Sequence, residues 1–469
     1  MKVSCIGHSF DYEAGNVARL FFDDVTVAFS DDGDLLTYAS EQNGMWVCRV
    51  VYKDTEKTVS ESSDSETGER VLGKAIFETL CEATGKRPPW GILTGVRPIR
   101  ITERKGENAA DFLVRQSLVS EEKATLAVKT AKNESKILSL SRPESFSLYI
   151  GIPFCPSRCL YCSFVSKTVE NAGKLIDEYA EKLVKDIAFT AETARRCALR
   201  LESVYFGGGT PTVLSSGQLD RIMKAVSGHF DLSHLREYTV EGGRPETITE
   251  DKLDTLIVNG CDRLSINPQT MHDSVLSACG RNHTVDDVYR AYEMARNFPF
   301  HTVNMDLIAG LVSDTAEGFC YSLDSVLALK PENVTVHTLC IKRAAYLNEE
   351  RPPLPSDEDV VKMLSYSQKM LDKSGYIPYY LYRQRNTLAN GENVGWAKPG
   401  HESYYNVYIM DQTHTILSCG AGGVNILRQP NGDHIERVFH YKYPYEYISR
   451  FDTLMERKQQ IAAFYERYQ

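Results

Sequence analysis

The middle of the chain alternates short apolar runs with amphipathic stretches, and this alternation restricts the fold more than any other feature. The stretches between the apolar runs have the residue spacing of helices that bury one face. The strand-like runs are Ser147–Ile152, Ser203–Phe206, Glu237–Glu241, Arg263–Asn267, Thr302–Ile308 and Asn333–Leu339. Repeated βα units predict an α/β fold in which helices cover a parallel sheet. Six units would form a partial (β/α)6 barrel with its active site at the carboxyl ends of the strands.

We expect three parts in the chain. They are an N-terminal α+β domain with its linker at 1–141, the partial barrel at 142–345, and a C-terminal auxiliary, substrate-side region at 346–469. In the first part, β-rich runs separated by turn residues predict a hairpin or meander. The polar run Glu56–Glu69 is expected to be a solvated loop, and helical spacing begins near Val71.

Charge and hydropathy exclude several classes of protein. The chain has 53 Lys and Arg against 63 Asp and Glu, a formal net charge of −10, which argues against a general nucleic-acid binder or a basic membrane-surface protein. No apolar run approaches the length of a membrane span, and the N-terminus lacks the pattern of a secretory signal. We therefore predict a cytoplasmic protein, in which twelve cysteines are more consistent with thiols or metal ligands than with disulfides.

Three of these cysteines fall close together in the run from Tyr149 to Cys162. Cys155, Cys159 and Cys162 are separated by three and then two residues, so one loop could present three thiolates to an iron–sulfur cluster. Three protein ligands would leave one iron of a [4Fe–4S] cluster open to a cofactor. The alternatives are a zinc site or three unrelated thiols, although structural zinc usually has four ligands in paired spacing.

Polar and glycine residues occur where the predicted strands end. Gly207, Gly208 and Gly209 precede Thr210 after the second strand, and glycine lets a backbone approach a ligand closely. A tight βα turn is the structural alternative. At or after later strands stand Glu241, Gln269, Arg281 and Asp306, of which Asp306 interrupts an apolar run that also contains Ile308. Such side chains contact ligands in barrel folds, although an ion pair of Arg281 with Glu241 or Asp306 would also explain them.

The cysteine motif resembles that of the radical S-adenosylmethionine (SAM) superfamily, which carries C-x3-C-x2-C after the first strand of a partial (β/α)6 barrel. The resemblance implies a [4Fe–4S] cluster whose open iron binds SAM, and cleavage of SAM to methionine and a 5′-deoxyadenosyl radical. Binding of one SAM, or of two, is implied.

Further motifs resemble those of the oxygen-independent coproporphyrinogen III oxidases, and four segments narrow the match to the HemZ-type coproporphyrinogen dehydrogenases. These segments are Trp90–Pro98, Glu241–Ile248, Tyr382–Asn386 and Glu392–Gly400. The resemblance implies that Tyr149 lies beside the cluster as a catalytic residue. It implies SAM binding by Gly208, Gly209, Thr210, Glu241, Gln269, Arg281, Asp306 and Ile308, and metal binding by Cys155, Cys159 and Cys162. The chain departs from the family at Gly151, Ser163 and Asn267, which weakens a direct transfer of substrate.

The implied activity is radical SAM oxidative decarboxylation of coproporphyrinogen III propionates to vinyl groups, giving protoporphyrinogen IX in anaerobic heme biosynthesis. Such an oxidoreductase needs an electron-donor protein such as flavodoxin or ferredoxin. A tetra-anionic substrate needs cations and flat apolar walls. The candidate cations are Arg97, Arg244, Arg383 and Arg385, and the candidate walls are Tyr379, Tyr380, Tyr382 and Trp396. The alternative for both sets is a solvated strand face.

Two other functions remain open at this point. A heme-binding chaperone of the same family would bind SAM without decarboxylation, and His337, His401 and His414 could then serve as heme ligands. A radical SAM methyltransferase or ring-opening enzyme acting on a tetrapyrrole would use the same cofactors.

Overall fold

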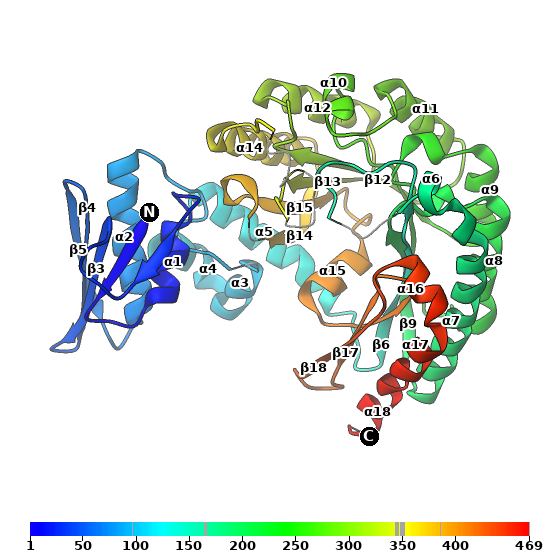
Figure 1. Ribbon diagram of the computed structural model, residues 1–469, viewed down its shortest axis with the longest axis horizontal. Coiled ribbons are helices and arrows are strands. Elements are labelled where there is room, and N and C mark those ends of the chain that lie inside the picture. The colour runs from blue at the N-terminus through cyan, green and yellow to red at the C-terminus, as the bar shows by residue number, and fades with distance from the viewer. Residues whose placement is uncertain (96, 164–166, 343–346, 348–351, 385, 469) are drawn as a thin grey trace. The chain divides into compact units, whose positions relative to one another are not determined.

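The computed structural model describes residues 1–95, 97–163, 167–342, 347, 352–384 and 386–468 (Figure 1). Two compact units make up the chain. The first unit comprises Met1–Ala131 with Tyr382–Gly391, and the second comprises Lys132–Leu381 with Glu392–Gln469. No helix among the described residues is both long and apolar enough to cross a membrane.

The first unit is built on a mixed five-stranded sheet in the order β2-β1-β3-β4-β5. Its strands are β1 (Lys2–Ile6), β2 (Thr26–Ala28), β3 (Leu35–Gln42), β4 (Met45–Tyr52) and β5 (Thr55–Ser62). Helix α2 (Gly68–Thr84) buries Val71, Leu72, Ile76 and Phe77 in the core of this unit, and Gly85 ends the helix at a φ of 71°. Helix α1 (Asp11–Ala18) adds Ala14 and Val17 to the same core.

The prediction of a loop at Glu56–Glu69 is wrong for the first half of that segment, because β5 pairs antiparallel with β4 from Thr55 to Ser62. β5 lies at the edge of the sheet, and its side chains alternate between half-buried and exposed along most of its length. An edge strand needs no apolar residues on its solvent side, so its sequence is as polar as that of a loop. The short helices α3 (Ile99–Lys105) and α4 (Ala109–Asp111) and the longer α5 (Glu121–Leu138) lead to the second unit.

The second unit contains the expected partial barrel. Its parallel strands run in the order β6-β9-β10-β11-β12-β13, with every strand paired parallel to its neighbour. They are β6 (Ser145–Ile152), β9 (Arg200–Gly208), β10 (Glu237–Glu241), β11 (Arg263–Ser265), β12 (Thr302–Ala309) and β13 (Asn333–Thr338). The covering helices are α7 (Ile176–Arg196), α8 (Ser216–His229), α9 (Glu250–Val258), α10 (Asp273–Ala278), α11 (Val285–Arg296) and α12 (Ala316–Leu329) (Figure 1). The predicted α/β fold is therefore confirmed.

C-terminal residues extend the barrel sheet at both ends, so that the described residues form an eleven-stranded sheet. Beyond β13 lie β15 (Glu392–Ala397), which is antiparallel to it, and β14 (Ile377–Arg383). Beyond β6 lie the parallel β16 (Thr415–Cys419) and the antiparallel β17 (Val424–Arg428) and β18 (Ile435–Phe439). Further α-helices among the described residues are α6 (Val169–Ala172), α14 (Asp357–Lys373), α15 (Tyr404–Asp411), α16 (Pro444–Ser449), α17 (Phe451–Lys458) and α18 (Gln460–Glu466).

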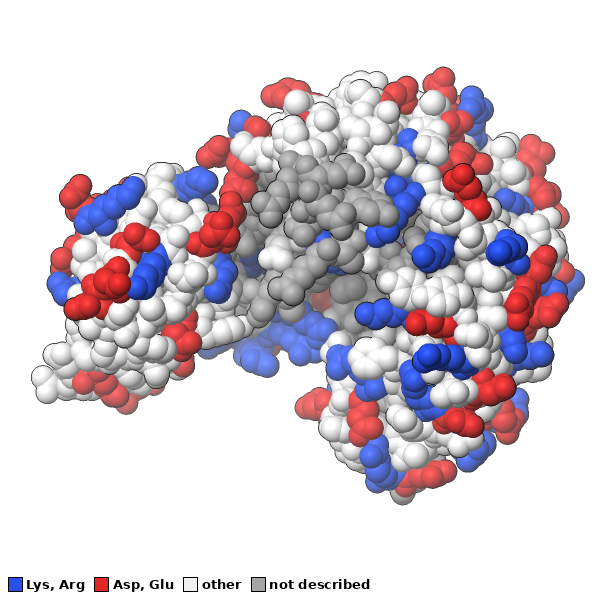
Figure 2. All heavy atoms as spheres, in the orientation of Figure 1, with Lys and Arg blue, Asp and Glu red and all other residues white. Residues whose placement is uncertain are grey.

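The net negative charge is not gathered in one place on the face of the second unit that Figure 2 shows, where acidic and basic side chains are interspersed. A mixed surface of this kind gives no broad electrostatic field that would favour one class of charged partner.

Candidate active site

The cysteine loop leaves the barrel at the carboxyl end of β6. Cys155 closes the short strand β7 (Phe154–Cys155), which pairs with β8 (Lys167–Thr168) where the loop returns. The loop is fastened to the segment after α10, because Ser157 Oγ donates to Gly280 O at 3.0 Å and Leu160 N donates to Cys279 O at 3.0 Å. These bonds hold the three cysteines over the end of the barrel where strand-end ligands are expected.

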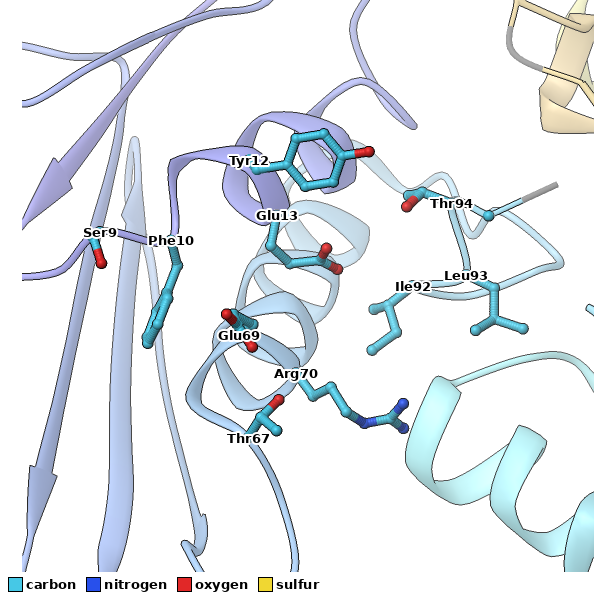
Figure 3. A pocket seen from close by; sticks show the side chains of 11 residues that line it. Ser9, Phe10, Tyr12, Glu13, Thr67, Glu69, Arg70, Ile92, Leu93 and Thr94 are labelled. Carbon is cyan, nitrogen blue, oxygen red and sulfur yellow. The ribbon is translucent and has the colours of Figure 1, made fainter. Parts of the chain in front are cut away.

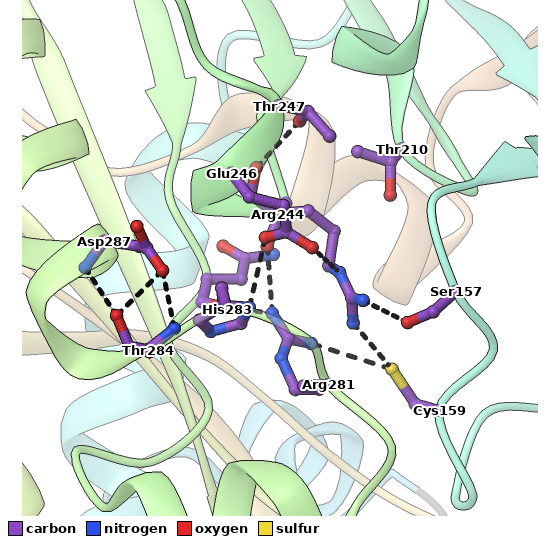
Figure 4. Close-up of polar contacts among 12 residues, drawn as sticks. Ser157, Cys159, Thr210, Arg244, Glu246, Thr247, Arg281, His283, Thr284 and Asp287 are labelled. Carbon is purple, nitrogen blue, oxygen red and sulfur yellow. Dashed lines mark hydrogen bonds and ion pairs between the residues drawn. The ribbon is translucent and has the colours of Figure 1, made fainter.

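Polar side chains of other strands meet the cysteine thiols. Thr210 Oγ1 lies 3.6 Å from Cys155 Sγ, and Arg244 Nη1 lies 3.1 Å from Cys159 Sγ (Figure 4). No three His, Cys, Asp or Glu side chains of the described residues form a group suited to a single metal ion. A zinc ion would draw its ligands together at about 2.0–2.3 Å, whereas each cysteine of a [4Fe–4S] cluster binds a different iron. The cluster assignment and the zinc alternative both stay predictions at this point.

The glycine turn after β9 packs directly on the backbone that precedes Cys155. Gly209 N donates to Ile152 O and Thr210 N donates to Phe154 O, both at 2.7 Å. A Cβ atom at Gly209 would lie 2.4 Å from Phe154 O, and Gly208 has a φ of 107°. The glycines are therefore required by this close approach, and they bring the turn next to the cysteine loop.

We expect Gly209→Ala to destabilise the second unit by about 1–3 kcal/mol, because the new methyl group overlaps backbone oxygen atoms that cannot turn away. Urea-induced unfolding followed by circular dichroism measures the effect. Gly217→Ala in α8 is the matched control, since its Cβ would meet nothing within 4 Å. Equal free energies of unfolding for the two variants would contradict the close approach of Gly209 to the backbone before Cys155.

A stack of tyrosine rings stands beside the glycine turn. Tyr149 on β6 is in register with Tyr205 on β9, and the Tyr205 ring stacks on Tyr405 of α15 with centroids 4.3 Å apart. The Tyr205 hydroxyl donates to Glu241 Oε1 at 2.5 Å. Sequence reasoning missed Tyr205 and Tyr405. Tyr205 lies opposite Tyr149 in a pair of predicted parallel strands, and this could have indicated its place in the site. Nothing in the sequence around Tyr405 indicates such a place.

The carboxyl group of Glu241 lies deep in this region. Burial raises its pKa to about 7, and the nearby Asp306 adds to that effect, while Tyr205 and His337 act against it. Asn304 Nδ2 donates to Asp306 Oδ1 at 2.7 Å, and His337 Nε2 lies 3.8 Å from Asp306 Oδ2. Glu241 and Asp306, predicted from separate strand ends, are thus electrostatic neighbours.

Gln269 follows β11 in a strained conformation. It has a φ of 70°, and its backbone is bonded on both sides to β12, from Gln269 N to Asp306 O and from Ile308 N to Gln269 O. Its buried Oε1 has no hydrogen-bond partner among the described residues. A buried acceptor left unsatisfied is costly, and a strained backbone that orients it is typical of a ligand-binding position.

Arg281 does not form the ion pair with Glu241 or Asp306 that was the structural alternative to a role in ligand binding. Its guanidinium donates to Tyr161 Oη at 3.1 Å, to Asn267 O at 2.6 Å and to Gly243 O at 3.2 Å, and Nη1 lies 3.9 Å from Cys159 Sγ. Its buried Nε has no partner among the described residues. Arg281 thus joins the cysteine loop to the ends of β10 and β11.

The arginines expected to meet substrate differ in their surroundings. Arg244 is 3% exposed and contacts Cys159, Ser157 and Glu246. Arg383 belongs to the first unit, where it donates to Leu93 O and Asn390 O and lies over the Trp90 ring. Arg97 is half-buried in the same unit, and Arg385 lies outside the described residues. The expected walls Tyr379, Tyr380 and Trp396 are buried, so a solvated strand face is excluded for them.

The three histidines considered as heme ligands fall at opposite ends of the barrel. His337 lies near the carboxyl end of β13, beside Asp306. The carbonyl of His401 accepts a hydrogen bond from Asn333 at the amino end of β13, and His414 precedes β16 at its amino end. Burial lowers the pKa of His414 to about 3, and its ring stacks on Tyr408. Of the three, His337 alone lies on the side of the cysteine loop.

A separate cavity of about 380 Å³ lies in the first unit, between α1, the start of α2 and residues 92–95 (Figure 3). Glu13, Glu69 and Arg70 supply its charged lining. Burial and the neighbouring Glu69 raise the pKa of Glu13 to about 7. None of the residues predicted to bind the cluster or SAM lines this cavity.

Comparisons with known proteins show the family of this chain. A profile of the Radical SAM superfamily matches residues 149–320. The oxygen-independent coproporphyrinogen-III oxidase-like protein HemZ of Bacillus subtilis is 32% identical over 94% of this chain and 93% of its own. The heme chaperone HemW of Lactococcus lactis is 31% identical over 64% of this chain and 74% of its own. The solved structure of coproporphyrinogen III oxidase (HemN) from Escherichia coli superposes with a TM-score of 0.54 at 24% identity, covering 69% of this chain and 73% of that one. The chain therefore belongs to the radical SAM superfamily, in the family of the HemZ-like proteins related to oxygen-independent coproporphyrinogen III oxidase.

Proposed function

We propose that the protein oxidatively decarboxylates propionate side chains of coproporphyrinogen III to vinyl groups. The observation that supports this most is the meeting of the cysteine loop, the glycine turn, the Tyr149–Tyr205–Tyr405 stack and Glu241 at one end of the barrel, in a chain related to HemZ over 94% of its length. Coproporphyrinogen III is the substrate class that the relatives' names supply.

The residues present fit both implied cofactors. Cys155, Cys159 and Cys162 would hold a [4Fe–4S] cluster, because thiolates are the ligands such clusters require and a cationic guanidinium already lies against one of them. Gln269 Oε1 and Arg281 Nε, both buried without a partner among the described residues, offer an acceptor and a donor to SAM. When bound, the two cofactors together would supply the radical that removes a hydrogen atom from the propionate β-carbon, and loss of carbon dioxide with transfer of one electron to a one-electron acceptor would leave the vinyl group.

The protein itself contributes to the reaction by positioning SAM and the substrate and by excluding water from them. The turn at Gly208 and Gly209, which packs on the cysteine loop, would contact the methionine part of SAM through its backbone, and Glu241 and Asp306 offer carboxylate oxygens to the hydroxyl and ammonium groups of SAM. The half-buried ring of Tyr149 and the buried ring of Tyr405 form an apolar wall beside Glu241. Arg97, Arg383 and Arg385 stay sequence-based candidates for binding the substrate carboxylates, and a low-potential protein such as flavodoxin or ferredoxin would donate electrons.

The raised pKa of Glu241 predicts a pH-dependent affinity for SAM. Since an ionised carboxylate attracts cationic SAM, we expect the affinity to rise about tenfold from pH 6 to pH 8, as the group with a pKa of about 7 loses its proton. Anaerobic calorimetry on protein with a reconstituted cluster measures this affinity. Glu241→Gln should remove the rise while Asp306 and His337 remain, and a pH profile unchanged in that variant would assign the dependence to another group.

One anaerobic assay tests the proposed function against its alternatives. Protein with a reconstituted cluster is incubated with SAM, a reductant and coproporphyrinogen III, and the products are analysed by mass spectrometry. Vinyl products together with 5′-deoxyadenosine are expected. Tight heme binding without turnover would support the chaperone alternative, and a methyl group from SAM on the tetrapyrrole would support the methyltransferase alternative.

A further inference from the structure

Arg244 occupies a place in the fold that differs from that of a substrate-binding arginine. It follows β10 through Gly243, which has a φ of 60°, and it begins the turn at Pro245–Thr247. This backbone path directs the side chain toward the cysteine loop and not toward solvent (Figure 4). With its side chain 4% exposed, its charge is removed from water. A guanidinium in such a place needs partners that compensate for lost hydration.

Every nitrogen of the Arg244 guanidinium has a partner on the protein. Nε donates to Glu246 Oε1 at 3.0 Å, Nη1 donates to Cys159 Sγ at 3.1 Å, and Nη2 donates to Ser157 Oγ. Two of the three partners belong to the cysteine loop itself. Three of the five N–H donors of the guanidinium are therefore bound to the protein, and two of these three orient the cysteine loop.

Glu246 keeps Arg244 in this position from the other side. Its Oε2 lies 3.2 Å from His283 Nδ1, so the carboxylate bridges the arginine and the segment after α10. Arg281 brings a second guanidinium to the same thiol, with Nη1 3.9 Å from Cys159 Sγ. Two guanidinium groups thus surround Cys159 with one carboxylate between them, and the surroundings of this ligand are electropositive.

We infer that Arg244 is a positioning residue that sets the reduction potential of the cluster through Cys159. The inference rests on the proposed function only in requiring that Cys159 binds the cluster. Hydrogen bonds to ligand sulfur and nearby positive charge stabilise the reduced state, which carries one more negative charge than the oxidised state. The electron comes from a one-electron reductant, and Arg244 neither gains nor loses a proton in the step.

The test measures the ratio of reduced to oxidised cluster at one fixed potential, by electron paramagnetic resonance, without SAM or substrate. Arg244→Gln should keep the iron and sulfide content but lower this ratio about tenfold, a shift of about 59 mV for a one-electron couple. Arg244→Lys keeps the charge without the fork and should lower the ratio about threefold. Arg296→Gln, which breaks an ion pair with Glu332 just before β13, is the matched control and should match the wild type.

A wild-type ratio in either Arg244 variant that carries a full cluster would overturn the inference. Loss of iron from both variants would also overturn it, because Arg244 would then serve assembly and not reduction. A wild-type protein that assembles no cluster would instead refute the proposed function, so the two failures are distinguishable.

Discussion

Cys155→Ala is expected to remove the absorbance of the iron–sulfur cluster and to lower reductive cleavage of SAM by more than about 100-fold, beyond the usual effect of changing a residue that only supports a ligand. Cys155 closes β7, and its thiol lies 3.6 Å from Thr210 Oγ1 at the glycine turn. Iron and sulfide analysis after anaerobic reconstitution measures the first effect, and the yield of 5′-deoxyadenosine measures the second.

The control for this variant is Cys320→Ala, which removes a half-buried thiol from α12 and should leave both measurements unchanged. Full iron–sulfur absorbance in Cys155→Ala would contradict the cluster assignment. Loss of absorbance in the control as well would point to a general effect on folding.

Lys458→Met is expected to destabilise the second unit by about 3–5 kcal/mol, because it leaves a buried carboxylate without its counter-charge. Lys458 and Asp186 both have fully buried side chains, and Nζ lies 2.5 Å from Asp186 Oδ1. Burial alone would raise the pKa of Asp186, but the charge of Lys458 lowers it. The pair therefore stabilises the fold above the ordinary pKa of an aspartate, and this contribution is lost as the pH falls through the lowered value.

The same pair supports the strand that carries the cysteine loop. Asp186 Oδ2 accepts from Gly420 N at 3.0 Å, and Tyr179 Oη accepts from the next amide, Ala421 N, at 2.8 Å. Tyr179 Oη in turn donates to Gly151 O at 2.6 Å, four residues before Cys155 on the chain. A variant that loosens this network should therefore also weaken retention of the cluster.

Urea-induced unfolding followed by circular dichroism measures the cost of Lys458→Met. The double variant Asp186→Asn with Lys458→Met removes both charges and keeps a hydrogen-bonding oxygen atom, so it should recover more than half of the lost stability. A single variant within about 1 kcal/mol of the wild type would show that the pair is not needed for stability.

The barrel could be predicted because its signals are local. The strand Glu237–Glu241 has the predicted bounds, since turn residues follow it directly. The edge strand β5 was missed for the opposite reason: solvent covers it, so its composition is polar.

Contacts between distant residues could not be predicted in the same way. β16 joins the barrel beside β6 although more than half of the chain separates them, and only their pairing in space reveals it. The bond from Arg244 to Cys159 joins residues 85 positions apart, and Tyr405 reaches Tyr205 from a helix that no motif marks. The spacing of the cysteines and glycines in the sequence was enough to predict a site. The side chains that surround them could be identified only from the structure.

The most direct test of the proposed reaction follows the hydrogen atom. Coproporphyrinogen III deuterated at the propionate β-carbons is incubated anaerobically with the cluster-containing protein, SAM and reductant, and the 5′-deoxyadenosine is analysed by mass spectrometry. We predict that deuterium appears in 5′-deoxyadenosine as the vinyl product forms. Unlabelled 5′-deoxyadenosine with unchanged coproporphyrinogen, from protein that carries a full cluster, would contradict the proposed decarboxylation.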